Sequence, residues 1–146
     1  MGDNQNSRLY AYIKYLYDKV RCLNLESSVI FTGKVSDEDL KTYFLISKVF
    51  TLTSYHEGFC VPLIEAMNMK IPIVAYGSTA VAETIGKAGL VWDELDINLI
   101  SASIDEIVNN EDAYFYLGEI GWNRYKSCFK NQIIKENFLK TINTLL

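Results

Sequence analysis

Residues 54–67, SYHEGFCVPLIEAM, hold the densest group of chemically active residues in this 146-residue chain. The run VFTLT at 49–53 comes directly before them and, being β-branched and aromatic, predicts a strand. Val61 and Pro62 predict the start of a helix, because proline at the first helical position gives up no hydrogen bond. The sequence therefore places a glycine-containing loop between a strand end and a helix start.

A loop in that position is where doubly wound sheets bind ligands. Free backbone N–H groups at the helix start favour an anion such as phosphate, and Gly58 lets that anion approach the backbone. Glu57 lies on the loop, and Glu65 lies inside the helix with a side chain that leans back toward the loop. We expect both carboxylates to reach one cleft, where each can accept hydrogen bonds from a vicinal diol. A nucleotide sugar, with a diphosphate between two polyhydroxylated rings, fits this arrangement.

Strands and helices alternate along the rest of the chain, which predicts a parallel sheet with right-handed crossovers, the doubly wound α/β class. A helix capped by Asn6 or Ser7 is expected first, and a capping box of Ser36 and Asp39 opens the second helix. The expected strands are 29–31, 49–53, 71–75 and 89–92. The expected helices are 7–24, one from Ser36, one from Val61, 81–85, 97–109, 112–128 and 132–146.

Composition limits the class of protein. The length favours one domain over residues 1–146, and 49% hydrophobic with 22% charged residues excludes a disordered or fibrous chain. The net charge of −4 argues against a nucleic-acid partner. Three widely spaced cysteines and a single histidine indicate reduced cytosol and no metal site. Without a run of 18 apolar residues or a signal peptide, a cytoplasmic location is expected.

The stretch from Glu57 to Met67 resembles the E-x7-E motif of the retaining glycosyltransferases of family 4 (group 1), which has the form EGFG followed by EAM. Glu57 and Glu65 match the two glutamates at the right separation. Four flanking segments are similar to the family as well: VIFTGKVS at 29–36, IPIVA at 71–75, AETI at 82–85 and GLV at 89–91. The resemblance covers about residues 20 to 146 and implies the C-terminal, donor-binding half of a GT-B fold with a Rossmann-like sheet.

This resemblance assigns roles to individual residues. It implies that Glu57 faces the transferred sugar as the catalytic carboxylate and that Glu65 holds the ribose hydroxyls. It implies transfer with retention of configuration, no metal and no cofactor beyond the nucleotide-sugar substrate. The remaining donor-binding residues implied are Gly58, Phe59 and Cys60 around the diphosphate, Gly33, Lys34 and Val35 beside the base, and Val61.

The sequence also departs from the family pattern. Cys60 stands where the family usually has glycine, and Ala82 replaces the usual proline. The resemblance begins near the end of the family's second strand of this domain, so the first strands, the diphosphate-binding arginine and lysine, and the acceptor domain would lie upstream. We therefore expect a partial domain with an exposed sheet edge that could mediate oligomerisation. We expect the isolated chain to transfer no sugar.

The function expected is transfer of a sugar to a glycan or lipid-linked acceptor in surface polysaccharide or glycoconjugate synthesis, with the full-length enzyme in the cytoplasm or peripheral at the inner membrane face. The alternative is a non-catalytic module that binds a nucleotide or a partner subunit through a degenerate donor site. The two glutamates favour the enzyme, whereas the missing cations favour the module. His56 is expected at the surface, and Asp93, Glu94 and Asp96 are expected in a solvated turn.

Overall fold

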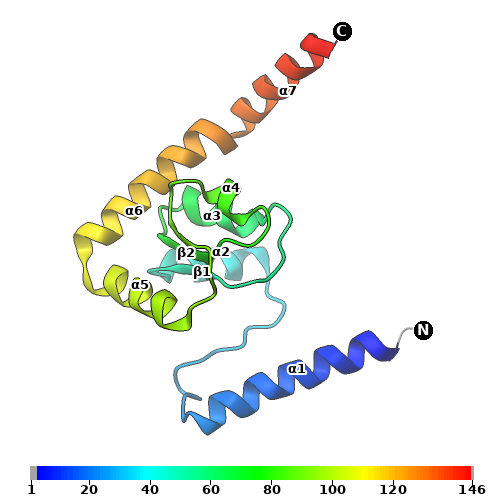
Figure 1. Cartoon of the computed structure of the whole chain (residues 1–146), viewed down its shortest axis with the longest axis vertical. Coiled ribbons are helices and arrows are strands. Elements are labelled where there is room, and N and C mark those ends of the chain that lie inside the picture. The colour runs from blue at the N-terminus through cyan, green and yellow to red at the C-terminus, as the bar shows by residue number, and fades with distance from the viewer. Residues whose placement is uncertain (1–2, 146) are drawn as a thin grey trace. The chain divides into compact units, whose positions relative to one another are not determined.

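The computed structural model describes residues 3–145, with side chains described from Leu9 onward. The chain divides into two compact units, the first ending at Ser36 and the second beginning at Asp37 (Figure 1). Within residues 3–145, no helix combines the length and the apolar character needed to cross a membrane.

The first unit consists of helix α1 (Asp3–Cys22) and an irregular segment that follows it. The helix begins before the predicted residue 7, so the expectation of an N-cap at Asn6 or Ser7 is wrong. The polar residues at its start carry no apolar periodicity, which is the signal on which that boundary rested. After the helix, the Phe31 ring packs on the Tyr17 ring with centroids 4.4 Å apart and brings the segment back onto α1.

The strand predicted at 29–31 is wrong, because these residues form irregular chain. The sheet of the described chain contains three strands, and none of them pairs with this segment. A β-strand requires a hydrogen-bonding neighbour, whatever the propensity of its residues. The apolar run VIF at 29–31 instead contributes Phe31 to the contact with Tyr17.

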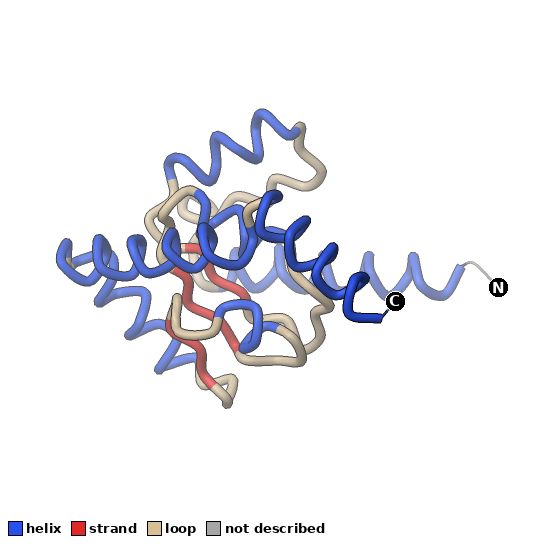
Figure 2. Tube along the Cα trace, turned by 90° about the horizontal axis from the view of Figure 1, so that it is seen from above, coloured by secondary structure: helices blue, strands red, loops and turns tan. Residues whose placement is uncertain are grey.

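The second unit is built on a parallel sheet of β1 (Phe50–Leu52), β2 (Ile73–Tyr76) and β3 (Leu90–Trp92), in the order β1-β2-β3. Phe50 pairs with Ile73, and Val74 pairs with Leu90. Figure 2 shows the strands in the middle of this unit with helices around them. These strands confirm the predictions at 49–53, 71–75 and 89–92, and the parallel sheet confirms the α/β class. Strand β1 forms one edge, and the oligomer expected through an edge stays a prediction.

The helices of the second unit also follow the predicted ranges, with one difference. Helix α6 ends at Arg124 and continues as a π-helical turn, η1, so the single α-helix expected over 112–128 is wrong only at its end, residues 125–128. The two helices that flank α6 and η1, α5 and α7, begin within one residue of the predicted positions. At the start of α5, the Asp96 side chain accepts hydrogen bonds from the N–H groups of Asn98 and Leu99. The bounds are α2 Asp37–Ile46, α3 Val61–Asn68, α4 Val81–Ile85, α5 Ile97–Asn109, α6 Glu111–Arg124, η1 Tyr125–Phe129 and α7 Asn131–Leu145.

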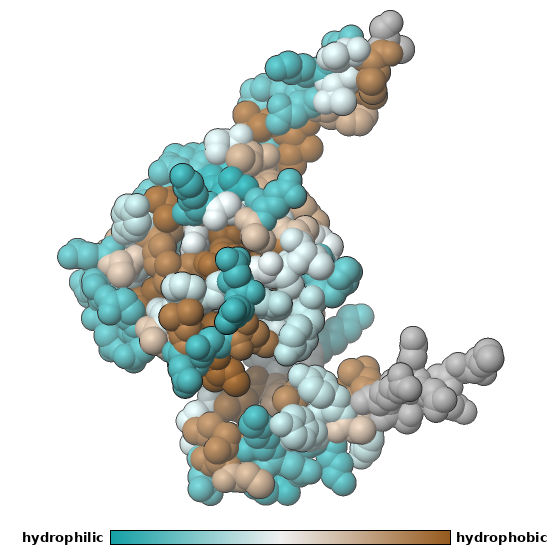
Figure 3. Space-filling view, viewed as in Figure 1, coloured by the Kyte–Doolittle hydropathy of each residue, from teal (hydrophilic) through white to brown (hydrophobic). Residues whose placement is uncertain are grey.

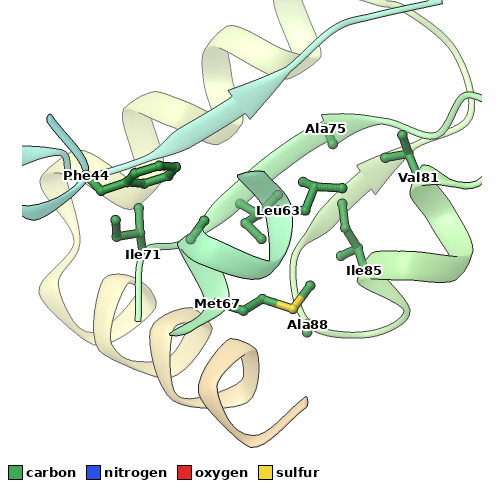
Figure 4. Close-up of a cluster of buried hydrophobic side chains, with 10 residues drawn as sticks. Phe44, Leu63, Met67, Ile71, Ala75, Val81, Ile85 and Ala88 are labelled. Carbon is green, nitrogen blue, oxygen red and sulfur yellow. The ribbon is translucent and has the colours of Figure 1, made fainter. Parts of the chain in front are cut away.

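Apolar side chains cover both faces of strand β2, which explains its unbroken apolar sequence. On one face, Ile73 and Ala75 lie in a cluster with residues of α2, α3 and α4, shown in Figure 4. On the other face, Val74 lies in a cluster with buried residues of α5 and α6. The core thus lies on both sides of the sheet, and the carboxyl ends of the strands remain at its rim.

Helix α6 approaches the segment after α3 very closely at Gly118. A Cβ atom added there would come 2.5 Å from the backbone carbonyl oxygen of Lys70, a distance that side chains do not tolerate. Helix α7, in contrast, contributes no buried residue. Its apolar side chains are exposed, as Figure 3 shows along the upper arm of the molecule, and they include Ile134, Phe138, Leu139 and Ile142.

Candidate functional site

The loop of residues 53–60 leaves the carboxyl end of β1 and enters the N-terminus of α3, as the sequence predicts. Glu57 is half-buried in this loop, and Thr79, in the turn between β2 and α4, holds its backbone. The Glu57 N–H donates to Thr79 Oγ1 at 3.0 Å, and the Thr79 hydroxyl donates to the Glu57 carbonyl at 2.5 Å. One threonine hydroxyl thus satisfies both backbone groups of the residue predicted to face the sugar.

Two neighbouring hydroxyls hold the same loop. The Ser78 hydroxyl donates to the Ser54 carbonyl at 2.6 Å, and the Thr84 hydroxyl donates to the Phe59 carbonyl at 3.4 Å. We call Ser78, Thr79 and Thr84 the hydroxyl clamp. Sequence reasoning missed it. The available signal was the group of hydroxyl residues just after β2, because adjacent parallel strands bring their carboxyl ends to one rim of the sheet.

The N-terminus of α3 has an unusual backbone. Cys60 precedes the helix in the left-handed region, with φ of 56°, and its side chain makes no capping hydrogen bond. Its carbonyl accepts from the Leu63 N–H at 3.0 Å. Glycine adopts a left-handed φ more easily than any other residue. The structure therefore gives a physical reason why the glycosyltransferase family described above usually has glycine at the position of Cys60.

The Cys60 thiol is kept neutral by its surroundings. Burial raises its pKa above the ordinary value, the Leu63 backbone N–H lowers it by less, and the nearby negative charge of Glu57 raises it further. Since the thiolate is the nucleophilic form, this environment disfavours a nucleophilic role for Cys60.

Gly58 and Phe59 form the outer side of the loop. A Cβ atom added at Gly58 would meet no atom within 4 Å, so open space borders the backbone there. The Phe59 ring meets Phe129 of η1 edge to face, with centroids 5.9 Å apart. The loop is therefore packed against η1 through Phe59 and open to solvent at Gly58, where a ligand could approach the backbone.

Glu65 is half-buried on α3 and lines an open pocket of about 290 Å³ between α3 and α2. Asp37, Leu40, Lys41, Phe44 and Met69 complete the lining, and Glu57 is not among these residues. The structure thus places Glu65 beside a pocket with a cation of its own, Lys41. The expectation that both glutamates reach one cleft stays a prediction.

The other predicted residues fall in different parts of the chain. Gly33, Lys34 and Val35 belong to the first unit, where Gly33 has a φ of 60°, and their role beside a base stays a prediction. Val61 is exposed at the first position of α3, and His56 is exposed on the loop. Asp96 caps α5. Among the residues whose side chains the structure describes, 9–145, no three acidic, cysteine or histidine side chains are grouped so as to hold a metal ion.

Comparison with known proteins identifies the family to which this geometry corresponds. The family model described as glycosyl transferases group 1 matches residues 11–124. The O-antigen chain mannosyltransferase B of Escherichia coli is 39% identical over 79 residues, which are 54% of this chain and 21% of that protein. The mannosylfructose-phosphate synthase of Agrobacterium fabrum is 29% identical over 130 residues, which are 88% of this chain and 29% of that protein.

Solved structures agree with the family match. The sucrose-phosphate synthase of Thermosynechococcus elongatus superposes with a TM-score of 0.79 at 26% identity, over 92% of this chain and 34% of that chain. The C-terminal domain of a group 1 glycosyl transferase family protein from Francisella tularensis shares the fold, with a TM-score of 0.75 at 21% identity over 85% of this chain and 65% of that chain. The chain thus spans less than a third of the two curated relatives it matches above.

Proposed function

The chain belongs to the group 1 glycosyl transferase family, and on that premise we propose that it binds a nucleotide-diphosphate sugar for transfer of the sugar with retention of configuration. The observation that carries this proposal is that Glu57 lies in the loop between the carboxyl end of β1 and the N-terminus of α3, and that Glu65 lies within α3 itself. An anion is favoured at such a helix N-terminus, and hydroxyl-rich rings on either side of it would meet the two carboxylates.

Each part of the donor has a corresponding part of the site. The diphosphate lies against the backbone of residues 58–61, where Gly58 leaves open space. Glu65 accepts the ribose hydroxyls in the pocket it shares with Lys41. Glu57, held by its backbone on the other side, contacts the transferred sugar. In keeping with the family resemblance, the proposed reaction uses no metal and no cofactor beyond the nucleotide-sugar substrate.

The relatives suggest which sugar and acceptor to test first. Two matched proteins are named mannosyltransferases of Escherichia coli, and one of them is named for the O-antigen chain. We therefore propose a hexosyl donor, with mannose as the first candidate, and a glycan or lipid-linked acceptor in surface polysaccharide synthesis. The three free cysteines fit a reducing, cytoplasmic location, including the inner face of the membrane.

A second candidate is a non-catalytic module that binds a nucleotide or a partner subunit. Arg124 favours it, because this arginine lies over the Phe129 ring behind the loop yet donates to the carbonyls of Glu83 and Thr84. A guanidinium engaged in this way is not directed at a diphosphate. The two candidates differ in one measurable property: only the transferase turns over a nucleotide sugar, and that turnover should require Glu57.

Calorimetry with the nucleoside diphosphates UDP and GDP tests the donor site in the full-length protein. Losing one charge-assisted contact costs about 1.5–3 kcal/mol, so Glu65→Ala should weaken binding roughly 10- to 150-fold. Glu38→Ala is the matched control, since Glu38 is an exposed carboxylate of α2 outside the pocket lining. The control removes the same charge and should keep affinity within about two-fold, because exposed charges are screened. Unchanged affinity in Glu65→Ala would contradict the assignment of Glu65 to the donor ribose.

A further inference from the structure

We infer that Thr79 is a positioning residue for Glu57: its hydroxyl sets the place of the carboxylate by binding both backbone groups of that residue. The inference rests on the proposed function and names a residue of the same site. Thr79 lies outside the segments carried by the family motif, 22 positions from Glu57 in the chain.

The first argument is the pair of hydrogen bonds. Thr79 Oγ1 accepts from the Glu57 N–H at 3.0 Å and donates to the Glu57 carbonyl at 2.5 Å. A hydroxyl can donate and accept at once, which a methyl, a carboxylate or an ammonium group cannot. Serine and threonine are therefore the residues that can reproduce this closed pair of contacts from the Thr79 backbone.

The second argument is the backbone of Thr79 itself. Its φ of 45° lies in the left-handed region, where a β-branched residue is an outlier. Glycine or asparagine would adopt this conformation more easily. Residues held in such sparsely populated conformations gather at functional sites, where the surrounding structure fixes them. Here the strained backbone directs a hydroxyl at the predicted catalytic residue.

The third argument comes from the other two members of the hydroxyl clamp. Ser78 and Thr84 are buried and bind the carbonyls of Ser54 and Phe59, on either side of Glu57 in the loop. Thr79 itself is exposed. The buried members thus anchor the ends of the loop, and the exposed member orients its middle. Fixing a reacting group in this way increases the catalytic rate, because a misplacement of about 1 Å can lower the rate on the order of 10²-fold.

Three variants separate positioning from a structural role. Thr79→Val keeps the shape and removes the hydroxyl, Thr79→Ser keeps the hydroxyl, and Thr79→Gly removes the hydroxyl while relieving the left-handed backbone. In the full-length enzyme, we expect Thr79→Val and Thr79→Gly to lower kcat by about 10- to 100-fold, with a KM for the nucleotide sugar within about three-fold of the wild type. Thr79→Ser should retain kcat within about three-fold. Equal kcat in wild type and Thr79→Gly would overturn the inference.

A second measurement distinguishes failure of this inference from failure of the proposed function. Amide hydrogen exchange at the Glu57 N–H, measured by NMR in this chain, should accelerate at least about ten-fold in Thr79→Val and Thr79→Gly, but not in Thr79→Ser. If the full-length wild-type enzyme transfers no sugar, the proposed function fails, and exchange alone then decides whether Thr79 positions Glu57. Exchange at Glu57 that is the same in all four proteins would overturn the positioning role independently of activity.

Discussion

Glu57 and Cys60 lie on the same loop within electrostatic reach, so that the carboxylate opposes ionisation of the thiol. Burial is the larger cause of the raised pKa of Cys60, and the Glu57 charge adds to it. The loop therefore holds a carboxylate beside a thiol whose ionisation it opposes. This relationship gives a chemical reporter of the site that needs neither donor nor acceptor.

Alkylation of Cys60 should respond to Glu57. Because the raised pKa keeps the thiol protonated, its reaction with iodoacetamide should be slow near neutral pH and should increase as pH rises. Glu57→Gln removes the negative charge that raises the pKa of Cys60, so Cys60 should react faster in this variant at the same pH. Peptide mass spectrometry gives the rate, and the exposed Cys22 is the internal control. A Cys60 rate that is unchanged or lower in Glu57→Gln contradicts the contact.

Glu57 should act mainly on turnover. Removing one preorganised polar group from a site costs about 10²–10³-fold in rate, and Glu57→Gln in the full-length enzyme should lose that much kcat. Affinity for the free nucleoside diphosphate should stay within about three-fold, because that ligand lacks the transferred sugar. His56→Ala, at the exposed neighbouring position, should keep its turnover. Normal turnover in Glu57→Gln would contradict the catalytic role of Glu57.

Two glycine substitutions should separate function from stability. Gly58→Ala adds a methyl group to open space, so the free energy of unfolding, measured by urea denaturation, should change by no more than about 0.5 kcal/mol. The same methyl group stands where we place the diphosphate, so nucleoside diphosphate binding should weaken. Gly118→Ala meets the Lys70 carbonyl and should destabilise the fold by about 1–3 kcal/mol. A reversed order of the two stabilities would show that the α6 contact is looser than described.

Arg124 should stabilise the fold more than an exposed ion pair does. Its guanidinium donates to the Thr84 carbonyl at 2.7 Å and to the Glu83 carbonyl at 2.6 Å, and these belong to the last turn of α4. Arg124→Met should cost about 1.5–3 kcal/mol. Lys70→Met, which breaks the exposed pair with Glu119, should cost only about 0.2–1 kcal/mol. Urea unfolding of both variants checks the order, and equal costs would contradict it.

The sequence predicted the second unit well and the first unit poorly, for a physical reason. Strand β2 and helix α4 follow from apolar runs and turn residues, which are local signals. The run at 29–31 has the composition of a strand, but strand formation depends on a neighbour, and no described strand pairs with it. The early start of α1 is hidden by its polar residues, and the π-helical turn at Tyr125 has no local pattern to reveal it.

The candidate site shows the same division. Glu57, Glu65 and Gly58 are visible as a spaced motif, and the structure puts them at the expected strand end and helix start. Thr79 was not visible, because its contact with Glu57 joins segments 22 residues apart in the chain. A motif within one segment can be recognised from the sequence. Hydrogen bonds between distant segments depend on the fold and cannot.

The hydroxyl clamp has a consequence for protein engineering. The shape of residues 54–60 comes from contacts with residues 78–84, so a synthetic peptide of the loop and α3 would not keep that shape in solution. A graft of this loop onto another α/β scaffold would need both segments, each after one of two adjacent parallel strands. The smallest transplantable unit is therefore a strand pair with the segments that follow each strand, including α4 with Thr84, and not a linear motif.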